Sequence, residues 1–347
     1  MKKTISQKIK TDKSDMRQVI LNFPEQFRFG FESVKNIKKQ INNLYSSDQL
    51  TLVGNIIICG IGGSALPGSL IKLISKKFLA DIKTQIIIHR DYGLPFCASK
   101  KSLIICVSYS GNTEETISAY LEAKRKNFKI ISIASGGKLL ELSRKYATPI
   151  AIVPARIQPR CALGYQFSAL VGILEELKFI KNVQKKLLES VKNLNVKGLE
   201  KTGEKLAKKI INKIPIIYCS QSNKALAYLW KIKFNENSKI PSFWNYFPEL
   251  NHNEMVGYTL AKKYFSIIIL RDIDDNKRMQ KRMELTARIL EKKEKNISFI
   301  ELSEKNIWEK IFNNLILADW TSYHLAAFNK IDPMPVKIVE ELKKELK

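Results

Sequence analysis

The run Cys106-Val107-Ser108-Tyr109-Ser110-Gly111-Asn112-Thr113-Glu114-Glu115-Thr116 decides how the rest of the chain is interpreted. An apolar segment, Leu103 to Val107, comes first, and a helical pattern over 116–124 follows. Short apolar runs bounded by turn residues are typical of buried parallel strands. Asn112 and Glu115 have the spacing of a capping box, which favours a helix start at this point. The sequence therefore predicts a strand, a hydroxyl-rich loop and a helix.

The loop carries three hydroxyl side chains, on Ser108, Ser110 and Thr113. Unpaired backbone N–H groups and the positive end of the helix dipole would face the same spot, which favours a bound anion, most often phosphate. An ordinary Ser/Thr turn with a helix cap would have a similar sequence. Taken alone, the loop leaves both interpretations open.

A second strand–loop–helix pattern favours the phosphate interpretation. The apolar run 55–59 leads into Gly60-Ile61-Gly62-Gly63-Ser64-Ala65, and a helical pattern covers 66–76. The glycines allow a tight turn and close approach of a ligand to the backbone. A dinucleotide fold would need a third glycine at its fixed spacing and an acidic residue after the next strand, where this chain has Arg90. Since a Walker A loop is missing as well, a small phosphorylated molecule fits better than a nucleotide.

These two loops resemble those of the sugar isomerase (SIS) superfamily and, more narrowly, those of the bifunctional phosphoglucose/phosphomannose isomerase family. The most specific runs are Phe234-Asn235-Glu236-Asn237 and Pro248-Glu249-Leu250-Asn251-His252-Asn253-Glu254. Further runs that carry the resemblance lie, in order, at 90–95, 135–139, 158–165 and 332–336. The resemblance covers nearly the whole chain and implies two SIS domains with the ligand in the cleft between them.

The order of strand and helix patterns predicts the same fold class, α/β with two doubly wound parallel-sheet domains and bridging helices. We expect residues 1–155 to form an N-terminal helix and the first SIS domain. Residues 156–200 would form a crossover and bridging helices, and residues 201–347 the second SIS domain with a C-terminal helix.

Composition narrows the class of protein further. The chain has 347 residues, 45% of them hydrophobic and 27% charged, which is typical of a soluble globular protein of about two domains. No apolar run approaches the ~20 residues of a membrane span, and the Lys-rich N-terminus lacks the apolar core of a signal peptide. The five cysteines and three histidines have no metal-ligand spacing. We therefore expect a cytoplasmic protein without membrane partner, metal or cofactor.

The charge balance is strongly basic, with 59 Lys and Arg against 33 Asp and Glu, a net charge of +26. Such a surplus attracts nucleic acid at low salt. The lysines are nevertheless spread over the whole chain, without an aromatic-interleaved patch or a recognition-helix motif. We interpret them as solvated faces and expect no nucleic-acid partner, although a positive field would speed the capture of an anionic sugar phosphate.

An aldose–ketose isomerase must anchor the phosphate, open the sugar ring, move a proton between C1 and C2, and stabilise the enediolate. The hydroxyl loop is the candidate phosphate anchor. Glu236 lies beside a phenylalanine and two amides, which is unusual for a purely solvated helix face, and the resemblance assigns it to the C1/C2 proton transfer. The candidate phosphate contacts are Gly63, Ser64, Ser108, Ser110 and Thr113.

Three further residues complete the candidate site. The resemblance implies that His252 opens the pyranose by moving a proton between the ring oxygen and O1, and that the other subunit of a homodimer donates it. Arg160 is our candidate for holding the enediolate oxygen because arginine stays charged and cannot take the transferred proton, and Arg156 is the less favoured option. Lys343 matches a lysine on the last helix that reaches the sugar in the family.

These residues favour a metal-free cis-enediol isomerase that interconverts glucose 6-phosphate and mannose 6-phosphate with fructose 6-phosphate. Two alternatives stay open: an SIS-domain sensor of sugar phosphates, and an isomerase of another sugar phosphate. A sensor would need only the hydroxyl loop, whereas this chain also has Glu236, His252 and Arg160. The run Tyr218-Cys219-Ser220-Gln221 departs from the family, which usually has glycines there, and this leaves the fit of the substrate open.

Overall fold

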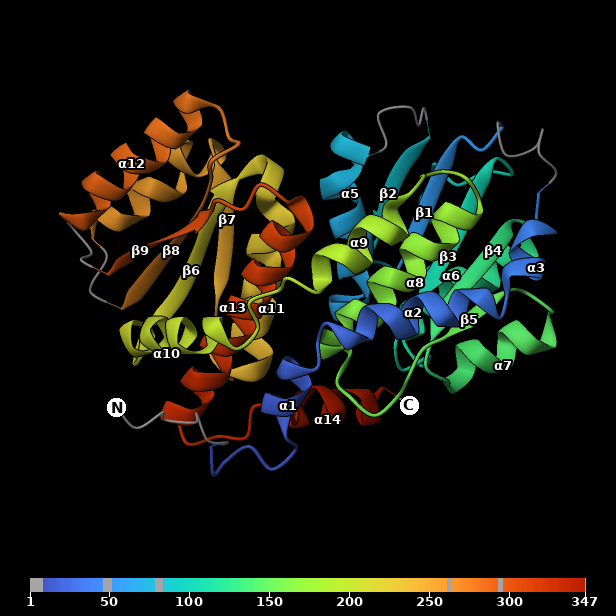
Figure 1. Cartoon of the computed structure of the whole chain (residues 1–347), viewed down its shortest axis with the longest axis horizontal. Helices are drawn as coiled ribbons and strands as arrows, with labels where there is room; N and C mark the ends of the chain where they lie inside the picture. Colours follow the sequence, from blue (N-terminus) through green and yellow to red (C-terminus); the bar gives the residue numbers. More distant parts are fainter. Residues whose placement is uncertain (1–8, 46–51, 79–83, 261–263, 293–295, 347) are drawn as a thin grey trace. The chain divides into compact units, whose positions relative to one another are not determined.

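The computed structural model describes residues 9–45, 52–78, 84–260, 264–292 and 296–346 (Figure 1). Its contacts divide the chain into two compact units. The first unit is formed by residues 22–193, and the second by residues 1–21 together with 194–347. Each unit contains one parallel sheet, which confirms the predicted α/β class.

The sheet of the first unit has the order β2-β1-β3-β4-β5, with every neighbouring pair parallel. Its register sets Cys59 opposite both His89 and Cys106. Isoleucine-rich runs form the central strands because β-branched side chains pack well on a pleated surface that is buried on both faces. The strands are β1 Asn55–Cys59, β2 Gln85–His89, β3 Ser102–Val107, β4 Lys129–Ala134 and β5 Ile150–Ile152.

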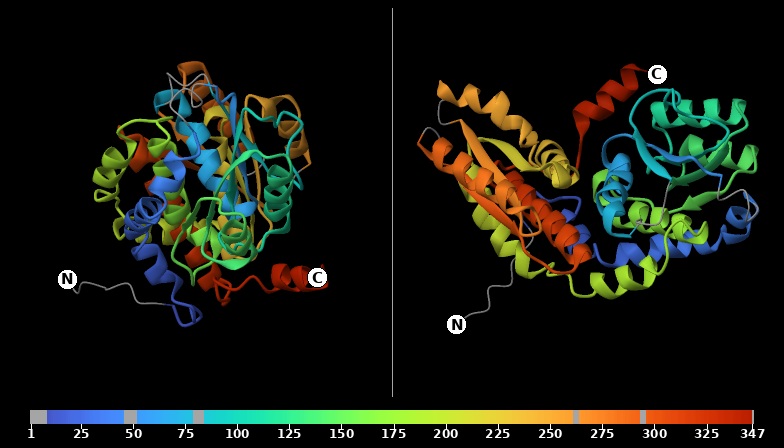
Figure 2. Two further views of the ribbon diagram at one scale, coloured as in Figure 1. Left: turned by 90° about the vertical axis from the view of Figure 1, so that its right-hand side faces the viewer. Right: turned by 90° about the horizontal axis from the view of Figure 1, so that it is seen from above.

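Helices cover both faces of this sheet (Figures 1 and 2). On one face, α6 and α7 pack over Ile57, Ile104 and Ile130. On the other, α5 approaches so closely that a Cβ on Gly68 would lie 2.7 Å from the Ile88 side chain. The helices are α2 Glu25–Lys35, α3 Lys38–Asn42, η1 Gly62–Ala65, α5 Leu66–Phe78, α6 Glu114–Arg125, α7 Gly137–Lys145, η2 Pro159–Cys161, α8 Leu163–Glu176 and α9 Val183–Val191.

The sheet of the second unit has the order β7-β6-β8-β9 and is also parallel throughout. It repeats the order of the first four strands of the other sheet, with β6 in the place of β1 and β8 in the place of β3. The edge strand β7 follows the central strand β6 just as β2 follows β1. The strands are β6 Ile214–Ser220, β7 Phe243–Phe247, β8 Phe265–Asp272 and β9 Ile297–Leu302.

Helices also cover both faces of the second sheet (Figure 2). Met283 and Leu290 of α12 pack on one face against Ile267 and Ile269. On the opposite side, α11 packs against β6 and α13, and α10 packs against α13. The helices are α1 Met16–Leu21, α10 Gly198–Ile210, η3 Gln221–Asn223, α11 Lys224–Asn237, η4 Glu249–His252, η5 Glu254–Thr259, α12 Lys277–Glu291, α13 Ile307–Phe328 and α14 Lys337–Glu345.

The compact units divide the chain differently from the three segments predicted above. The predicted bridging helix α8 is part of the first unit, where a Cβ on Gly30 of α2 would lie 2.0 Å from Ser168 Oγ. Residues up to 21 belong instead to the second unit, where Arg17 pairs with Glu200 at 2.9 Å. Close helix packing and a partly buried ion pair contribute to these boundaries, and neither has a strong signal in a single sequence.

Candidate active site

The order of strands in the first sheet places a topological switch point between β1 and β3. From β1 the chain continues to β2 on one side of β1, and β3 lies on the other side. The loops that follow β1 and β3 therefore diverge at the carboxyl ends of these two strands. Ligands of open α/β sheets bind in the crevice at such a point. Both loops singled out from the sequence start here, and the backbone N–H of Tyr109 donates a hydrogen bond to Ser64 Oγ at 3.0 Å. The two loops are therefore in direct contact.

The three hydroxyls of the second loop differ in their surroundings. Ser108 is fully buried, and its Oγ donates to Thr113 Oγ1 at 2.9 Å and accepts from the Gly111 N–H at 3.1 Å. Ser110 is exposed, and Thr113 is the half-buried N-cap residue of α6. Ser108 thus braces the loop from inside, while Ser110 is exposed beside the first turn of α6, which also carries Glu114 and Glu115.

The predicted capping box is wrong, because Asn112 has another partner. Helix α6 begins at Glu114, after the N-cap Thr113, and the Asn112 Oδ1 accepts a hydrogen bond from the Lys138 N–H at 2.9 Å. The loop 110–112 packs backbone to backbone against the Gly136-Gly137 turn, since a Cβ on Gly111 would lie 1.8 Å from Gly136 O. This second turn shapes the hydroxyl loop, and it lies in the run 135–139 that carries part of the family resemblance.

Arg160 lies next to the glycine-rich loop. A Cβ on Gly63 would lie 2.8 Å from the Arg160 backbone N, so only glycine lets η1 and η2 approach this closely. Arg160 is fully buried, whereas Arg156 is exposed. Gln26 of α2 holds the following turn, because its Nε2 donates to Cys161 O at 2.9 Å and its Oε1 accepts from the Gly164 N–H at 3.0 Å. Gln26 stands in no motif that would single it out in the sequence.

Glu236 is half-buried near the end of α11, in the second unit. A polar seam between α11 and α13 fixes the helix around it. Lys233 Nζ lies 2.7 Å from Asp319 Oδ1, and Asn237 Nδ2 donates to Ser322 Oγ at 2.8 Å. Residues one turn before Glu236 and directly after it are thus immobilised, which holds the carboxylate-bearing turn in place.

His252 ends the short helix η4, and its side chain is exposed. Both neighbouring residues are anchored. Asn251 Nδ2 donates to Thr286 Oγ1 of α12 at 2.9 Å, and Asn253 Nδ2 donates to Glu249 Oε1 at 2.8 Å. The segment therefore presents the imidazole outward from a fixed backbone.

The third predicted residue of the second unit, Lys343, lies on α14. No side chain of α14 is buried, and its apolar residues Ile338 and Leu342 are 78% and 59% exposed. The predicted site residues thus fall into two groups. The first unit carries Gly63, Ser64, Ser108, Ser110, Thr113 and Arg160, and the second carries Glu236, His252 and Lys343.

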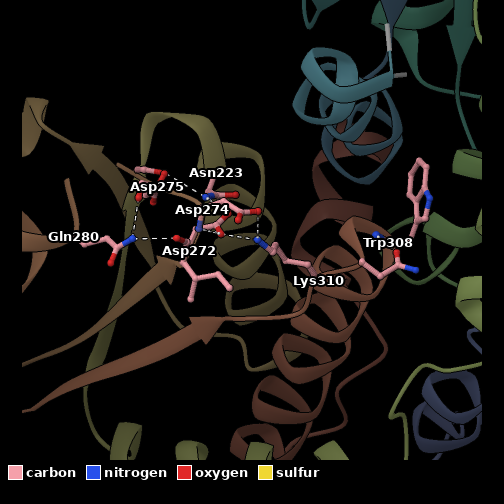
Figure 3. A network of polar contacts seen from close by, with 10 residues as sticks. Asn223, Asp272, Asp274, Asp275, Gln280, Trp308 and Lys310 are labelled. Atoms are coloured by element: carbon pink, nitrogen blue, oxygen red, sulfur yellow. Dashed lines mark hydrogen bonds and ion pairs between the residues drawn. The ribbon is translucent and has the colours of Figure 1, made fainter. Parts of the chain in front are cut away.

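The switch point of the second sheet, between β6 and β8, has the opposite chemistry (Figure 3). Asp272 ends β8, whereas the corresponding strand of the first sheet, β3, is followed by the hydroxyl loop. The Asp272 carboxylate accepts hydrogen bonds from Lys310 Nζ at 2.6 Å and from Asn223 Nδ2 at 3.1 Å. Lys310 also donates to Asp274 at 2.9 Å. Burial lowers the pKa of Lys310, but these carboxylates outweigh that effect and raise it, so the ammonium stays charged.

The acidic edge of the second sheet is therefore closed by its own ion pair. A phosphate placed there would be repelled by these carboxylates, because Lys310 is already paired with Asp272 and Asp274. Of the two switch points, the hydroxyl-lined one in the first unit is the suitable anion site.

Within the described ranges, no cluster of three or more His, Cys, Asp or Glu side chains could hold a metal ion, and no helix is long and apolar enough to cross a membrane.

Comparison with known proteins identifies relatives along nearly the whole chain. Residues 199–346 match the family described as the bacterial phospho-glucose isomerase C-terminal SIS domain. A bifunctional phosphoglucose/phosphomannose isomerase of Caldicellulosiruptor bescii is 37% identical over 95% of this chain and 98% of its own length. A D-glucosamine-6-phosphate 4-epimerase of Sulfolobus acidocaldarius is 30% identical over 82% of this chain and 86% of its own length.

Solved structures extend the similarity of fold. The C-terminal domain of glucosamine-fructose-6-phosphate aminotransferase from Francisella tularensis matches with a TM-score of 0.68 and 17% identity, over 92% of this chain and 98% of that domain. At this identity the likeness concerns the fold alone.

Proposed function

Because this chain belongs to the bifunctional phosphoglucose/phosphomannose isomerase family, we propose that it interconverts glucose 6-phosphate and mannose 6-phosphate with fructose 6-phosphate. The observation that carries the proposal is the meeting of two loops at the switch point of the first sheet, where the Tyr109 N–H binds Ser64 Oγ. The exposed hydroxyl of Ser110 and the first turn of α6 would receive the phosphate there. Ser64 and Ser108 would hold the loop in shape.

The chemistry we propose is a proton transfer through a cis-enediol. Glu236 would take the C2 proton of the aldose, the protonated carboxyl would exchange in part with solvent, and the same carboxyl would deliver a proton to C1 to give the ketose. Arg160 would stabilise the negative charge that develops on the enediolate oxygen. Glucose 6-phosphate and mannose 6-phosphate differ only in configuration at C2, so both pass through one enediol. Rotation of this enediol about its C2–C3 bond would present either face of C2 to Glu236, and the face that is protonated decides which aldose forms.

The hexose phosphates are mostly cyclic, so a ring-opening step must come before the enediol. We assign it to His252, which would move a proton between the ring oxygen and O1. The exposed imidazole supports a role toward a molecule outside its own unit. Lys343 is proposed to contact the sugar, and its exposed helix leaves the ammonium accessible.

We further propose a homodimer in which one subunit donates His252 to the site of the other. Apolar side chains are exposed directly after His252, with Val256 70% and Leu260 90% exposed on and after η5. On the neighbouring helix α12, Leu285 and Ile289 are 40% and 49% exposed. Exposed apolar side chains of this kind mark interaction surfaces. Mixing Glu236→Gln with His252→Asn protein under subunit exchange should then restore activity, whereas proven exchange without restoration would contradict the shared site.

A cytoplasmic location completes the proposal. The five cysteines are free thiols, four of them buried, as suits a reducing compartment. Location of a tagged chain by fluorescence microscopy in the source cell, with a known cytoplasmic marker as the control, would test it.

The activity is tested by incubating purified protein with fructose 6-phosphate and identifying the products by NMR. Our proposal predicts both aldose 6-phosphates. Binding without turnover would favour the sensor alternative. Turnover of glucosamine 6-phosphate but not of fructose 6-phosphate would favour another sugar phosphate, of the kind that the name of the Sulfolobus relative indicates. The Glu236→Gln protein serves as the matched control for contaminating isomerase.

A further inference from the structure

A chain of buried hydroxyls leads to the carboxylate of Glu254, two residues after His252. Tyr218 of β6 is fully buried, and its hydroxyl donates to Glu254 Oε1 at 2.5 Å. The Tyr218 hydroxyl also lies 2.7 Å from that of Tyr258. Because Tyr218 has one proton and gives it to the carboxylate, Tyr258 must donate to Tyr218. The chain is therefore directed from Tyr258 through Tyr218 to Glu254.

The second carboxylate oxygen is held from the neighbouring strand. Asn245 of β7 donates from Nδ2 to Glu254 Oε2. The Asn245 amide cannot be reversed without loss, because its Oδ1 accepts from the Tyr246 N–H at 2.8 Å. Both oxygens of Glu254 thus accept hydrogen bonds from adjacent strands. Charge-assisted bonds of this kind are stronger than neutral ones.

These bonds fix the backbone that carries His252. Glu254 begins η5, directly after Asn253, and the anchors of Asn251 and Asn253 described above lie on either side of the histidine. Glu254 adds β6 and β7 to the elements that hold this segment. Burial is the main cause that raises the pKa of Tyr218, so its hydroxyl remains a proton donor at any working pH.

We propose that Glu254, held by Tyr218 and Asn245, is a positioning residue that sets the orientation of His252 for ring opening. The inference rests on the proposed function of His252. It also gives a role to the fully buried hydroxyl of Tyr218.

Ring opening can be measured apart from isomerisation in a Glu236→Gln background. That protein cannot move the C2 proton, but it should still speed the exchange between the α and β anomers of glucose 6-phosphate, which exchange NMR detects. Adding Tyr218→Phe removes one hydroxyl and keeps the buried ring. We expect catalysed anomer exchange to fall about 10- to 100-fold, the size of effect expected for a misplaced catalytic group, while the Kd for glucose 6-phosphate stays unchanged.

Two further variants separate positioning from loss of structure. Asn245→Ala acts on the other oxygen of Glu254 and should lower the exchange in the same way. Tyr120→Phe, which removes a buried hydroxyl from the first unit that donates to Leu142 O at 3.2 Å, should leave the exchange unchanged. When His252→Asn is already present, Tyr218→Phe should have no further effect on exchange.

The outcomes separate the role of His252 from that of Glu254. If His252→Asn leaves anomer exchange intact, the proposed ring-opening role of His252 fails. If His252→Asn abolishes exchange but Tyr218→Phe and Asn245→Ala in folded protein do not reduce it, the positioning inference alone is overturned. An equal loss from Tyr218→Phe in the presence and absence of His252 would also overturn it.

Discussion

Ser110 and Ser108 should respond differently to alanine, although they are two residues apart in the same loop. Ser110 is exposed, so Ser110→Ala should remove a contact with the phosphate and leave folding unchanged. A hydrogen bond to a charged group contributes about 1.5–3 kcal/mol. At about 1.4 kcal/mol for each tenfold step, the Kd for glucose 6-phosphate should rise roughly 10- to 150-fold.

Ser108→Ala should instead destabilise the first unit. Its buried hydroxyl serves both the Gly111 N–H and Thr113 Oγ1, and an unsatisfied buried group costs about 1–3 kcal/mol. For a unit of this size, each kcal/mol lowers the Tm by about 2–4 °C. Calorimetric titration and thermal unfolding, both in the Glu236→Gln background to prevent turnover, measure the two effects. An unchanged Kd in Ser110→Ala, or a Tm loss shared equally by both variants, would refute this division of roles.

Three further predictions concern the loop, the pH dependence and metal. Gly111→Ala should prevent formation of the hydroxyl loop, because the φ of Gly111 is +72° and the added Cβ would lie 1.8 Å from Gly136 O. Gly136→Ala is the control, since its Cβ would meet open space, and this variant should fold and bind phosphate normally. Equal behaviour of the two variants in phosphate titrations would contradict the loop packing. His324 of α13 has a pKa lowered from 6.5, mainly by burial and against the opposing pull of Glu204 and Glu200, so its contribution to stability is present above pH 6.5 and lost as pH falls below it. His324→Gln should therefore flatten the pH dependence of urea unfolding below pH 6.5, and an unchanged slope would show that this histidine is not responsible. Isomerase activity should survive EDTA, as expected for an enediol route; loss with chelator and recovery with zinc would overturn the metal-free mechanism.

The sheet-forming strands could largely be predicted, because they are short apolar runs between turn residues. The run 55–59 appears as β1 with the same bounds, and the apolar segment 103–107 lies within β3. Strand β7 was not predicted, because its pattern mixes aromatic and polar residues at the exposed edge of a sheet. Edge strands have only one neighbour and need no continuous apolar run.

The candidate site could be predicted only where its residues stand in recognisable runs. The hydroxyl loop, Glu236 and His252 lie in such runs, and their roles remain predictions. Gln26 holds the turn after Arg160, Asp319 holds the helix that carries Glu236, and Tyr218 holds the segment after His252. Each acts from a distant part of the chain; Tyr218 and Glu254, for example, are 36 residues apart. A hydrogen bond between distant side chains has no local pattern, so a single sequence does not reveal it.

The most direct test of the proton transfer assigned to Glu236 follows the C2 proton. Fructose 6-phosphate is incubated with the protein in D2O, and the glucose 6-phosphate and mannose 6-phosphate formed are analysed by NMR for deuterium at C2. We predict deuterium at C2 of both products with the wild type and with Glu291→Gln, an exposed glutamate of α12 that serves as the control, and none with Glu236→Gln. Normal product formation and deuterium incorporation in the Glu236→Gln protein would contradict the proposed mechanism.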